Sequence, residues 1–208
     1  MIKIYTGLPR SGKTYLAVKD INDEFIYKPE EKTFFSFLKK PKKEPKYKRL
    51  YTNIGGFKHD QINEVFEHYE IDRKSIPLKW DIFYNHLKKL RDLDEEEQGD
   101  ESLIAYADKY NLYKSLIVID EAHKFFDKKL DTVLVWFLGY HGHMGMDIIL
   151  ITQNKVKLHS NYLADSENFV DAQPKSKSFG ANQLRYFYYA SSSYTDKQRF
   201  DKKSILAK

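Results

Sequence analysis

The chain has 208 residues, 41% of them apolar, and a formal net charge of +5 from 35 Lys and Arg against 30 Asp and Glu. This length fits one domain of ordinary size with its own core, and the basic balance favours anionic partners such as nucleotide, nucleic acid or an anionic membrane surface. The absence of cysteine excludes a disulfide framework and cysteine-based zinc sites, and no apolar stretch is long enough to span a bilayer.

The chain begins with a predicted strand, residues 2–6, which leads into a loop and then a predicted helix over residues 14–26. The loop fits the phosphate-binding pattern G-x-x-x-x-G-K-[ST] at every fixed position, in the strand–loop–helix context where this pattern binds nucleotide. Backbone N–H groups of such a loop, and the positive end of the helix dipole, attract phosphate oxygens. We therefore predict a nucleotide-binding set of Gly7, Leu8, Pro9, Arg10, Ser11, Gly12, Lys13, Thr14 and Tyr15.

Two residues of this loop have predicted chemical roles. We expect the ammonium of Lys13 to reach the β- and γ-phosphates of ATP, and the hydroxyl of Thr14 to bind Mg²⁺. A glycine-rich turn that binds nothing is the alternative interpretation. Because the motif starts at Gly7, removal of a signal peptide would destroy it, and we expect no such peptide.

A basic insertion follows the first helix. Residues 28–48 are rich in lysine, are interrupted by three prolines and include the aromatic stretch 33–38. Lysines interleaved with aromatic residues can contact nucleic acid or a membrane surface. We favour a solvated basic loop with a small aromatic anchor over direct contact with nucleic acid.

The next part of the chain alternates between strand and helix patterns. Residues 49–54 are predicted to form a strand, and the spacing of apolar residues predicts helices over 60–69, 77–91 and 102–110. Residues 92–101 form an acidic run, which we interpret as a solvated loop. Pairing of this run with the basic segment of a neighbouring subunit is the alternative.

A second motif lies at the end of a predicted buried strand. The four apolar residues 116–119 are typical of a parallel strand covered on both faces, and Asp120 and Glu121 follow them directly. In phosphate-loop ATPases an acid at this position assists Mg²⁺, and a neighbouring acid can polarise the attacking water. We assign the metal role to Asp120 and the general-base role to Glu121. Alone, an apolar run ending in two acids is as often a strand with a solvated turn, so the assignment depends on the loop upstream.

A further helix and strand follow. Residues 130–140 are predicted to form a helix that packs on the sheet through Leu130 and Trp136, among others. The apolar run within 147–152 predicts a buried strand whose tip carries Gln153. In many phosphate-loop ATPases a polar residue at such a tip senses the γ-phosphate or orients water, so Gln153 is the predicted sensor. A simple strand cap is the alternative.

The last part of the chain has strand character. Residues 168–171 and the tyrosine-rich residues 184–189 predict two strands, the second as an antiparallel extension of the sheet rather than an aromatic binding platform. The whole pattern predicts an α/β fold, a P-loop NTPase with a mainly parallel central sheet flanked by helices. We expect one such domain over residues 1–208.

Three blocks of sequence point to a known family. The first block covers residues 6–14, the second residues 118–126, and the third residues 141–153, with its pattern His-x-His-x-Gly-x-Asp before a strand. Together they resemble the N-terminal cytoplasmic domain of the zonular occludens toxin family, which includes the gene I assembly ATPases of filamentous phages. The first block is general to phosphate-loop proteins, whereas the other two are far more specific. The resemblance extends over most of the chain.

The resemblance implies a RecA-like motor ATPase that uses ATP and Mg²⁺ to drive phage assembly and export at the inner membrane. It implies a homo-oligomer, for which we expect a ring, and as partners phage assembly and export proteins, with phage single-stranded DNA or coat protein as candidate substrates. Members carry a transmembrane helix and a periplasmic part after this domain, and the reported toxin activity is attributed to the periplasmic part. We expect the chain to be the cytoplasmic domain of an inner-membrane protein, truncated or in a soluble variant.

The sequence departs from the family's pattern at two positions. Gly142 stands between the two histidines where arginine is common, which removes a candidate cation for the transferred phosphate. Arg185 and Arg199 are candidate replacements, donated to a neighbouring subunit. Arg10 occupies a loop position that is often glycine, and it could point at phosphates or outward.

The histidines allow more than one interpretation. His141 and His143 could share a metal only from a strand or loop, and Asp147 is the sole third ligand nearby. We favour local hydrogen bonds near the nucleotide or at a subunit edge. His123 could approach the γ-phosphate or fix Glu121.

Three functions are compatible with these features. A motor ATPase would hydrolyse ATP faster on assembly, when a neighbour's cation completes the site. A small-molecule or nucleoside kinase would need an acceptor pocket and an arginine-rich lid, for which the sequence has no signature. A module that binds nucleotide without turnover is the third, and the intact Lys13, Thr14, Asp120 and Glu121 argue against it.

Overall fold

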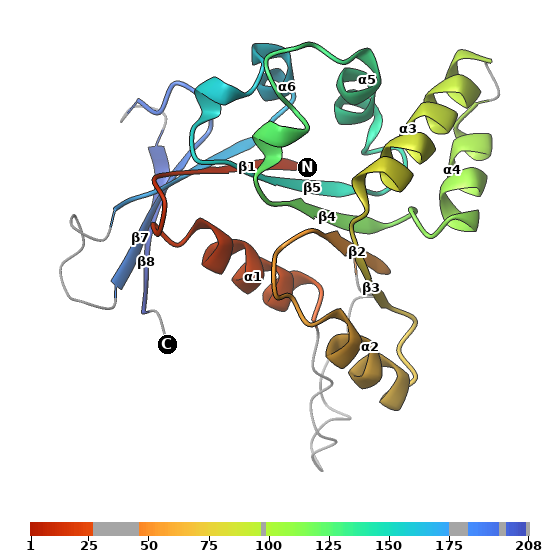
Figure 1. Ribbon diagram of the computed structural model, residues 1–208, viewed down its shortest axis with the longest axis horizontal. Helices are drawn as coiled ribbons and strands as arrows, with labels where there is room; N and C mark the ends of the chain where they lie inside the picture. Colours follow the sequence, from red (N-terminus) through yellow and green to blue (C-terminus); the bar gives the residue numbers. More distant parts are fainter. Residues whose placement is uncertain (27–45, 97–98, 175–182, 196–198, 207–208) are drawn as a thin grey trace.

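The computed structural model describes residues 1–26, 46–96, 99–174, 183–195 and 199–206. One eight-stranded sheet runs through the molecule in the order β3-β2-β4-β5-β1-β6-β7-β8. Helices cover both faces of it (Figure 1). This architecture confirms the predicted mainly parallel central sheet flanked by helices.

The strands from β3 to β6 in this order pair in parallel, and the last two join antiparallel. The antiparallel extension predicted for residues 184–189 is therefore confirmed. The strands are β1 (Ile2–Thr6), β2 (Arg49–Thr52), β3 (Lys74–Pro77), β4 (Ser115–Ile119), β5 (Asp147–Ile151), β6 (Asn168–Ala172), β7 (Gln183–Tyr189) and β8 (Arg199–Leu206).

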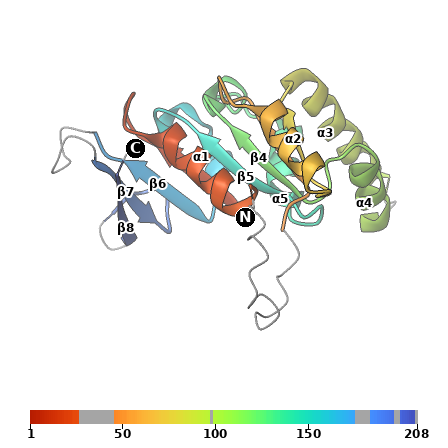
Figure 2. The same cartoon turned by 90° about the horizontal axis from the view of Figure 1, so that it is seen from below.

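Two hydrophobic clusters hold the helices to the sheet, one on each face. Helices α1 and α2 pack on one face and lie across the front of it in Figure 2, whereas α3, α4, α5 and α6 cover the other. The helices are α1 (Lys13–Glu24), α2 (His59–His68), α3 (Trp80–Glu95), α4 (Gly99–Lys109), α5 (Thr132–Tyr140) and α6 (Ser160–Ala164), with short 3-10 turns η2 (Ala122–Lys124) and η3 (Lys155–Lys157).

The central strands are apolar because helices cover both faces of the sheet around them. Every residue of β4 and of β5 is buried, as a strand between two helical layers requires. In register, β5 lies between β4 and β1, with Ile117 opposite Ile148 and Ile4 opposite Leu150. The carboxyl ends of β4, β5 and β1 therefore reach the same edge of the sheet, where the two predicted motifs begin.

The acidic run 92–101 was predicted as a loop, and this is wrong. Helix α3 continues through it to Glu95, and α4 begins at Gly99. Side-chain bonds explain the longer helix, because Arg91 pairs with Glu95 at 2.6 Å and the indole of Trp136 donates to Asp94 at 2.7 Å. Helical i, i+4 pairs of this kind stabilise the last turn.

Two other predictions about this half of the molecule need correction. Helix α5 begins at Thr132, because the carboxylate of Asp131 accepts hydrogen bonds from Val133 N and Leu134 N as its cap. Leu130 lies before the helix and is 42% exposed, so it does not pack on the sheet. Trp136 is only partly buried.

Most of the basic insertion 28–48 lies outside the described residues.

The described part of the chain holds no helix that is long and apolar enough to cross a membrane.

Candidate nucleotide-binding site

The loop between β1 and α1 has the backbone that its glycines predict. Gly7 has a φ of 137° and Gly12 a φ of 91°, both in the region that disfavours a side chain. A Cβ on Gly7 would lie 2.4 Å from the Ala172 carbonyl oxygen, and one on Gly12 would lie 2.7 Å from the Tyr186 hydroxyl. The loop therefore rests against β6 and β7, and only glycine fits at either contact.

The other loop residues divide between exposed and buried positions. Leu8, Pro9 and Arg10 are exposed, whereas Ser11 is fully buried. Arg10 also has a left-handed backbone, with a φ of 62°. Tyr15 lies one residue beyond the motif in α1 and is partly exposed.

The ammonium of Lys13 folds back over the loop. Its Nζ donates to the Leu8 carbonyl oxygen at 3.0 Å, and the residue is almost fully buried. Burial lowers the pKa of Lys13, and the carboxylates of Asp120 and Glu121 partly offset this effect. The structure therefore brings Lys13 close enough to Asp120 and Glu121 for their charges to interact.

Thr14 and Asp120 meet across the site. The Thr14 hydroxyl donates to Asp120 Oδ2 at 3.3 Å. A hydroxyl and a carboxylate oxygen at this separation are the hard oxygen ligands that Mg²⁺ takes, with water and phosphate completing its shell. Among the described residues no cluster of three or more His, Cys, Asp and Glu could hold a metal by itself. Thr14 and Asp120 therefore fit a magnesium ion whose remaining ligands would be water and the phosphate of a nucleotide.

Asn53 is a site residue that sequence reasoning missed. Its side-chain amide donates to the Asp120 carbonyl oxygen at 3.0 Å and accepts from Asp120 N at 2.7 Å. This paired contact fixes the backbone that carries Asp120. The available signal was its place after β2, because parallel strands end at the same edge of the sheet and β2 neighbours β4.

Glu121 is held between two side chains. Gln153 Nε2 donates to Glu121 Oε1 at 3.3 Å, and His123 Nε2 lies 3.4 Å from Glu121 Oε2. The other nitrogen of His123 lies 3.3 Å from the hydroxyl of Thr152, at the tip of β5. Glu121 also has a left-handed backbone with a φ of 51°, a conformation that costs energy outside glycine and clusters at functional sites. The side chain remains 37% exposed, so water can reach it.

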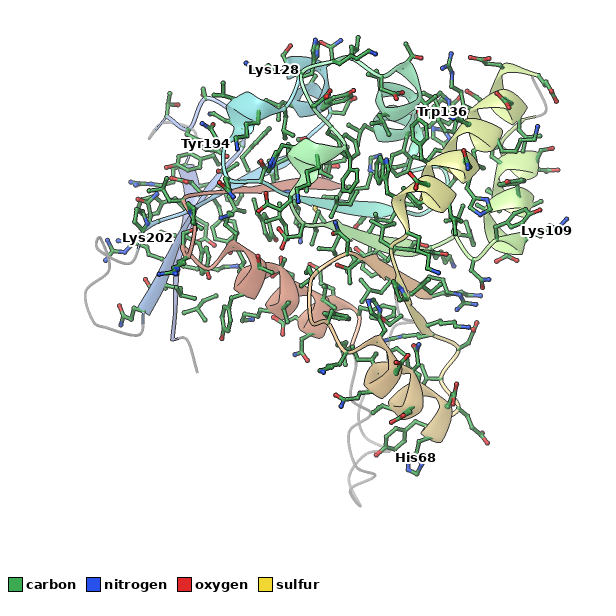
Figure 3. All side chains as sticks on the ribbon, in the orientation of Figure 1. His68, Lys109, Lys128, Trp136, Tyr194 and Lys202 are labelled. Carbon is green, nitrogen blue, oxygen red and sulfur yellow. The ribbon has the colours of Figure 1, made fainter. Side chains whose placement is uncertain are left out.

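A cavity of about 350 Å³ adjoins the start of the loop. It lies between Gly7, Gln153 and the end of β6, and Lys155 and Tyr194 also line it. Lys155 Nζ stands 3.7 Å from the centre of the Tyr194 ring. Burial lowers the pKa of Lys155, and Asp171 opposes this. The position of Tyr194 at this end of the sheet can be followed in Figure 3.

The histidine block lies away from this site. His141 and Gly142 precede β5, at the amino end of the strand whose carboxyl end carries Gln153. The imidazole of His141 contacts the Leu138 carbonyl oxygen at 2.7 Å, and His143 lies 2.9 Å from Asp100. His141 makes a local hydrogen bond as predicted, and the block does not lie near the phosphate loop. A place at a subunit edge stays a prediction. Arg185 and Arg199 belong to β7 and β8.

Comparison with known proteins gives the family. The family description "zonular occludens toxin (Zot)" matches residues 1–204. The chain belongs to the zonular occludens toxin family. No curated protein matches it.

Solved structures show the same fold. The N-terminal domain of zonular occludens toxin from Neisseria meningitidis superposes with a TM-score of 0.58 at 19% identity, covering 100% of this chain and 94% of that one. The genome packaging NTPase from Sulfolobus turreted icosahedral virus 2, solved with ATP-gammaS, superposes with a TM-score of 0.54 at 14% identity. This match covers 100% of this chain and 97% of that one. These matches and the strand order confirm the predicted P-loop NTPase fold, with its mainly parallel central sheet.

Proposed function

We propose that this chain binds ATP with Mg²⁺ and hydrolyses it, as the motor domain of a filamentous-phage assembly and export machine at the inner membrane. The observation that carries the proposal is the position of Glu121. Its carboxylate is exposed to water, is held by Gln153 and His123, and follows directly after Asp120, which faces the loop through Thr14. A loop for phosphate, oxygen ligands for a metal and a base for water are thus adjacent.

Each of these residues has a distinct proposed role. Lys13 would leave the Leu8 carbonyl and pair with the β- and γ-phosphates, while loop N–H groups bind the remaining oxygens. Thr14 and Asp120 would hold Mg²⁺, which neutralises phosphate charge when bound. Glu121 would accept the proton of the attacking water, and Gln153 would orient that carboxylate and sense the γ-phosphate.

The motor role draws on the family and on the fold. The chain belongs to the zonular occludens toxin family, and a viral genome packaging NTPase shares its fold. We infer that the chain works as a homo-oligomer, in which a neighbour supplies a cation that stabilises the transferred phosphate. Phage assembly proteins, single-stranded DNA or coat protein would be the partners, and membrane attachment would come from the family's transmembrane segment.

Steady-state ATP hydrolysis with Mg²⁺, measured across a range of protein concentrations, tests the proposal. Glu121→Gln should bind ATP like the parent and lose about 100- to 10,000-fold in turnover, the usual contribution of a general base. Glu64→Gln, an exposed change in α2 on another part of the surface, is the matched control and should behave like the parent. Activity per subunit that rises with concentration would support a shared site.

Two results would contradict the proposal. Turnover by Glu121→Gln equal to that of the parent would remove the base assignment. Flat hydrolysis per subunit at every concentration would show a site complete within one chain and would argue against the shared cation.

A further inference from the structure

Strand β7 contacts the phosphate loop, and one of the contacts is a hydrogen bond from a hydroxyl group. Tyr186 Oη donates a hydrogen bond to the Gly12 carbonyl oxygen at 2.9 Å, across 174 positions of sequence. The Tyr186 side chain is fully buried. Its neighbour Leu184 fills the rest of this contact, since a Cβ on Gly12 would lie 2.8 Å from a Leu184 methyl.

The bonded carbonyl belongs to the peptide that joins Gly12 to Lys13. The same oxygen also accepts from Leu16 N at 2.9 Å, the first backbone bond of α1. A trans peptide is planar, and its C=O and N–H point in opposite directions. Holding the Gly12 oxygen toward β7 therefore turns the Lys13 N–H away from β7, to the side of the loop where phosphate would bind.

We propose that Tyr186 is a positioning residue for phosphate binding, whose hydroxyl fixes the orientation of the Gly12–Lys13 peptide so that the Lys13 N–H faces the nucleotide. The inference rests on the proposed nucleotide binding and assigns a role to a strand outside both sequence motifs. Leu16 N already holds this oxygen, and the Tyr186 hydroxyl adds a second donor at a residue whose left-handed backbone, with a φ of 91°, has no side chain to limit its rotation.

The surroundings of Tyr186 suit a permanent donor. Burial raises the pKa of Tyr186 above its ordinary value, so the hydroxyl keeps its proton at neutral pH. Rotation of the peptide would leave this buried hydroxyl unpaired, which is costly. The contact therefore favours one orientation of the peptide before any nucleotide arrives, and pre-organisation of this kind raises affinity.

The experiment compares Tyr186→Phe with Tyr188→Phe. Tyr188 lies two residues along β7, on the same face, where its ring is 6.2 Å from that of Phe200. Affinity for ATP and for ADP is measured by calorimetry, and thermal stability is measured without nucleotide. Tyr186→Phe should weaken both nucleotides by about three- to tenfold, the loss expected from one net hydrogen bond. Tyr188→Phe should bind both like the parent.

The affinity of Tyr186→Phe for ATP and ADP distinguishes a positioning role of the hydroxyl from a role in packing alone. If Tyr186→Phe lowers the melting temperature but binds ATP and ADP like the parent, the inference is overturned. If Tyr186→Phe does not fold, a fluorinated tyrosine placed at position 186 serves instead, because its more acidic hydroxyl donates a stronger bond. That variant should bind ATP more tightly, and unchanged affinity would overturn the inference. A parent chain that binds no ATP would refute the proposed function itself, and this inference with it.

Discussion

Gly12→Ala offers a test of the loop that needs no nucleotide. The new Cβ would meet Tyr186 Oη at 2.7 Å and two Leu184 methyls at 2.8 and 3.0 Å, on a backbone with a φ of 91°. The left-handed conformation costs an ordinary residue about 1–2 kcal/mol. Overpacking a dense core costs about 1–3 kcal/mol more. The free energy of unfolding should therefore fall by about 2–5 kcal/mol, a large share of the total for a domain.

Urea denaturation followed by tryptophan fluorescence measures this change, since Trp80 and Trp136 both pack in or against the core. Gly139→Ala is the matched control. It lies inside α5, where a Cβ would meet nothing within 4 Å, so alanine should stabilise the protein by about 0.5–1 kcal/mol. In a Tyr186→Phe background the nearest clashing atom is absent, and Gly12→Ala should cost less than it does alone.

Equal urea midpoints for Gly12→Ala and the parent would refute the reasoning, because the contact of the loop with β7 would then be absent in solution. If Gly12→Ala lowers the free energy of unfolding by the same amount in the Tyr186→Phe background as in the parent, the clash is with Leu184 alone.

Three further predictions concern charge and position. Lys13→Ala should abolish ATP binding in calorimetry, because the only loop side chain proposed to reach the β- and γ-phosphates is lost. Burial raises the pKa of Asp147, but hydrogen bonds from Lys46, the N-terminal ammonium and Tyr47 outweigh it and hold that pKa below its ordinary value. A lowered folded pKa stabilises the protein above the unfolded pKa and ceases to do so as pH falls through the folded value. Asp147→Asn should therefore lower the free energy of unfolding at neutral pH, by about 1.5–3 kcal/mol if it loses the worth of a hydrogen bond to a charged group. In urea titrations that difference should shrink below about pH 4, and a difference independent of pH would contradict it. Gly142→Arg should fold as stably as the parent, because a Cβ there meets nothing within 4 Å, and should leave hydrolysis by the dilute chain unchanged; a change at high dilution would show that the position acts within one subunit.

The sequence predicts the centre of this fold well because the central strands are buried on both faces. A continuous apolar run such as 116–119 is compatible with few other environments, and it is β4 in the structure. The sequence also places Gln153 at the tip of a strand, and the structure brings its side chain to Glu121. Side chains at the tips of neighbouring parallel strands meet, and β5 pairs with β4.

The edges of the sheet are predicted less well. Strand β3 was missed because it has four residues, of which Ser75 alone is buried, so no apolar pattern identifies it. Strand β8 was missed because charged residues interrupt it, as in Lys202 and Lys203. Such strands form because a neighbour offers free backbone groups, and that neighbour is not visible in the local sequence.

The same limit applies to residues that support the site from a distance. Tyr186 occurs in a tyrosine-rich run that is sufficiently explained as a strand, and only the structure shows its hydroxyl against Gly12. Asn53 follows a short strand without any motif, and its two bonds to the backbone of Asp120 depend on the pairing of β2 with β4. Motifs identify the groups proposed to touch the nucleotide, whereas the groups that orient them come from tertiary contacts.

The position of Gly142 relative to β5 bears on what an arginine at this position could do in a relative. Gly142 precedes the first residue of β5 and Gln153 follows the last, so the length of the strand, about 16 Å, separates them along the sheet. An arginine at this position in a relative would project from the edge opposite the phosphate loop of its own subunit. Its guanidinium could then serve a neighbour's nucleotide or an assembly contact, but not the loop that its own chain carries. Glycine here would therefore leave the proposed chemistry within one subunit intact, and its effect would be confined to the assembled form.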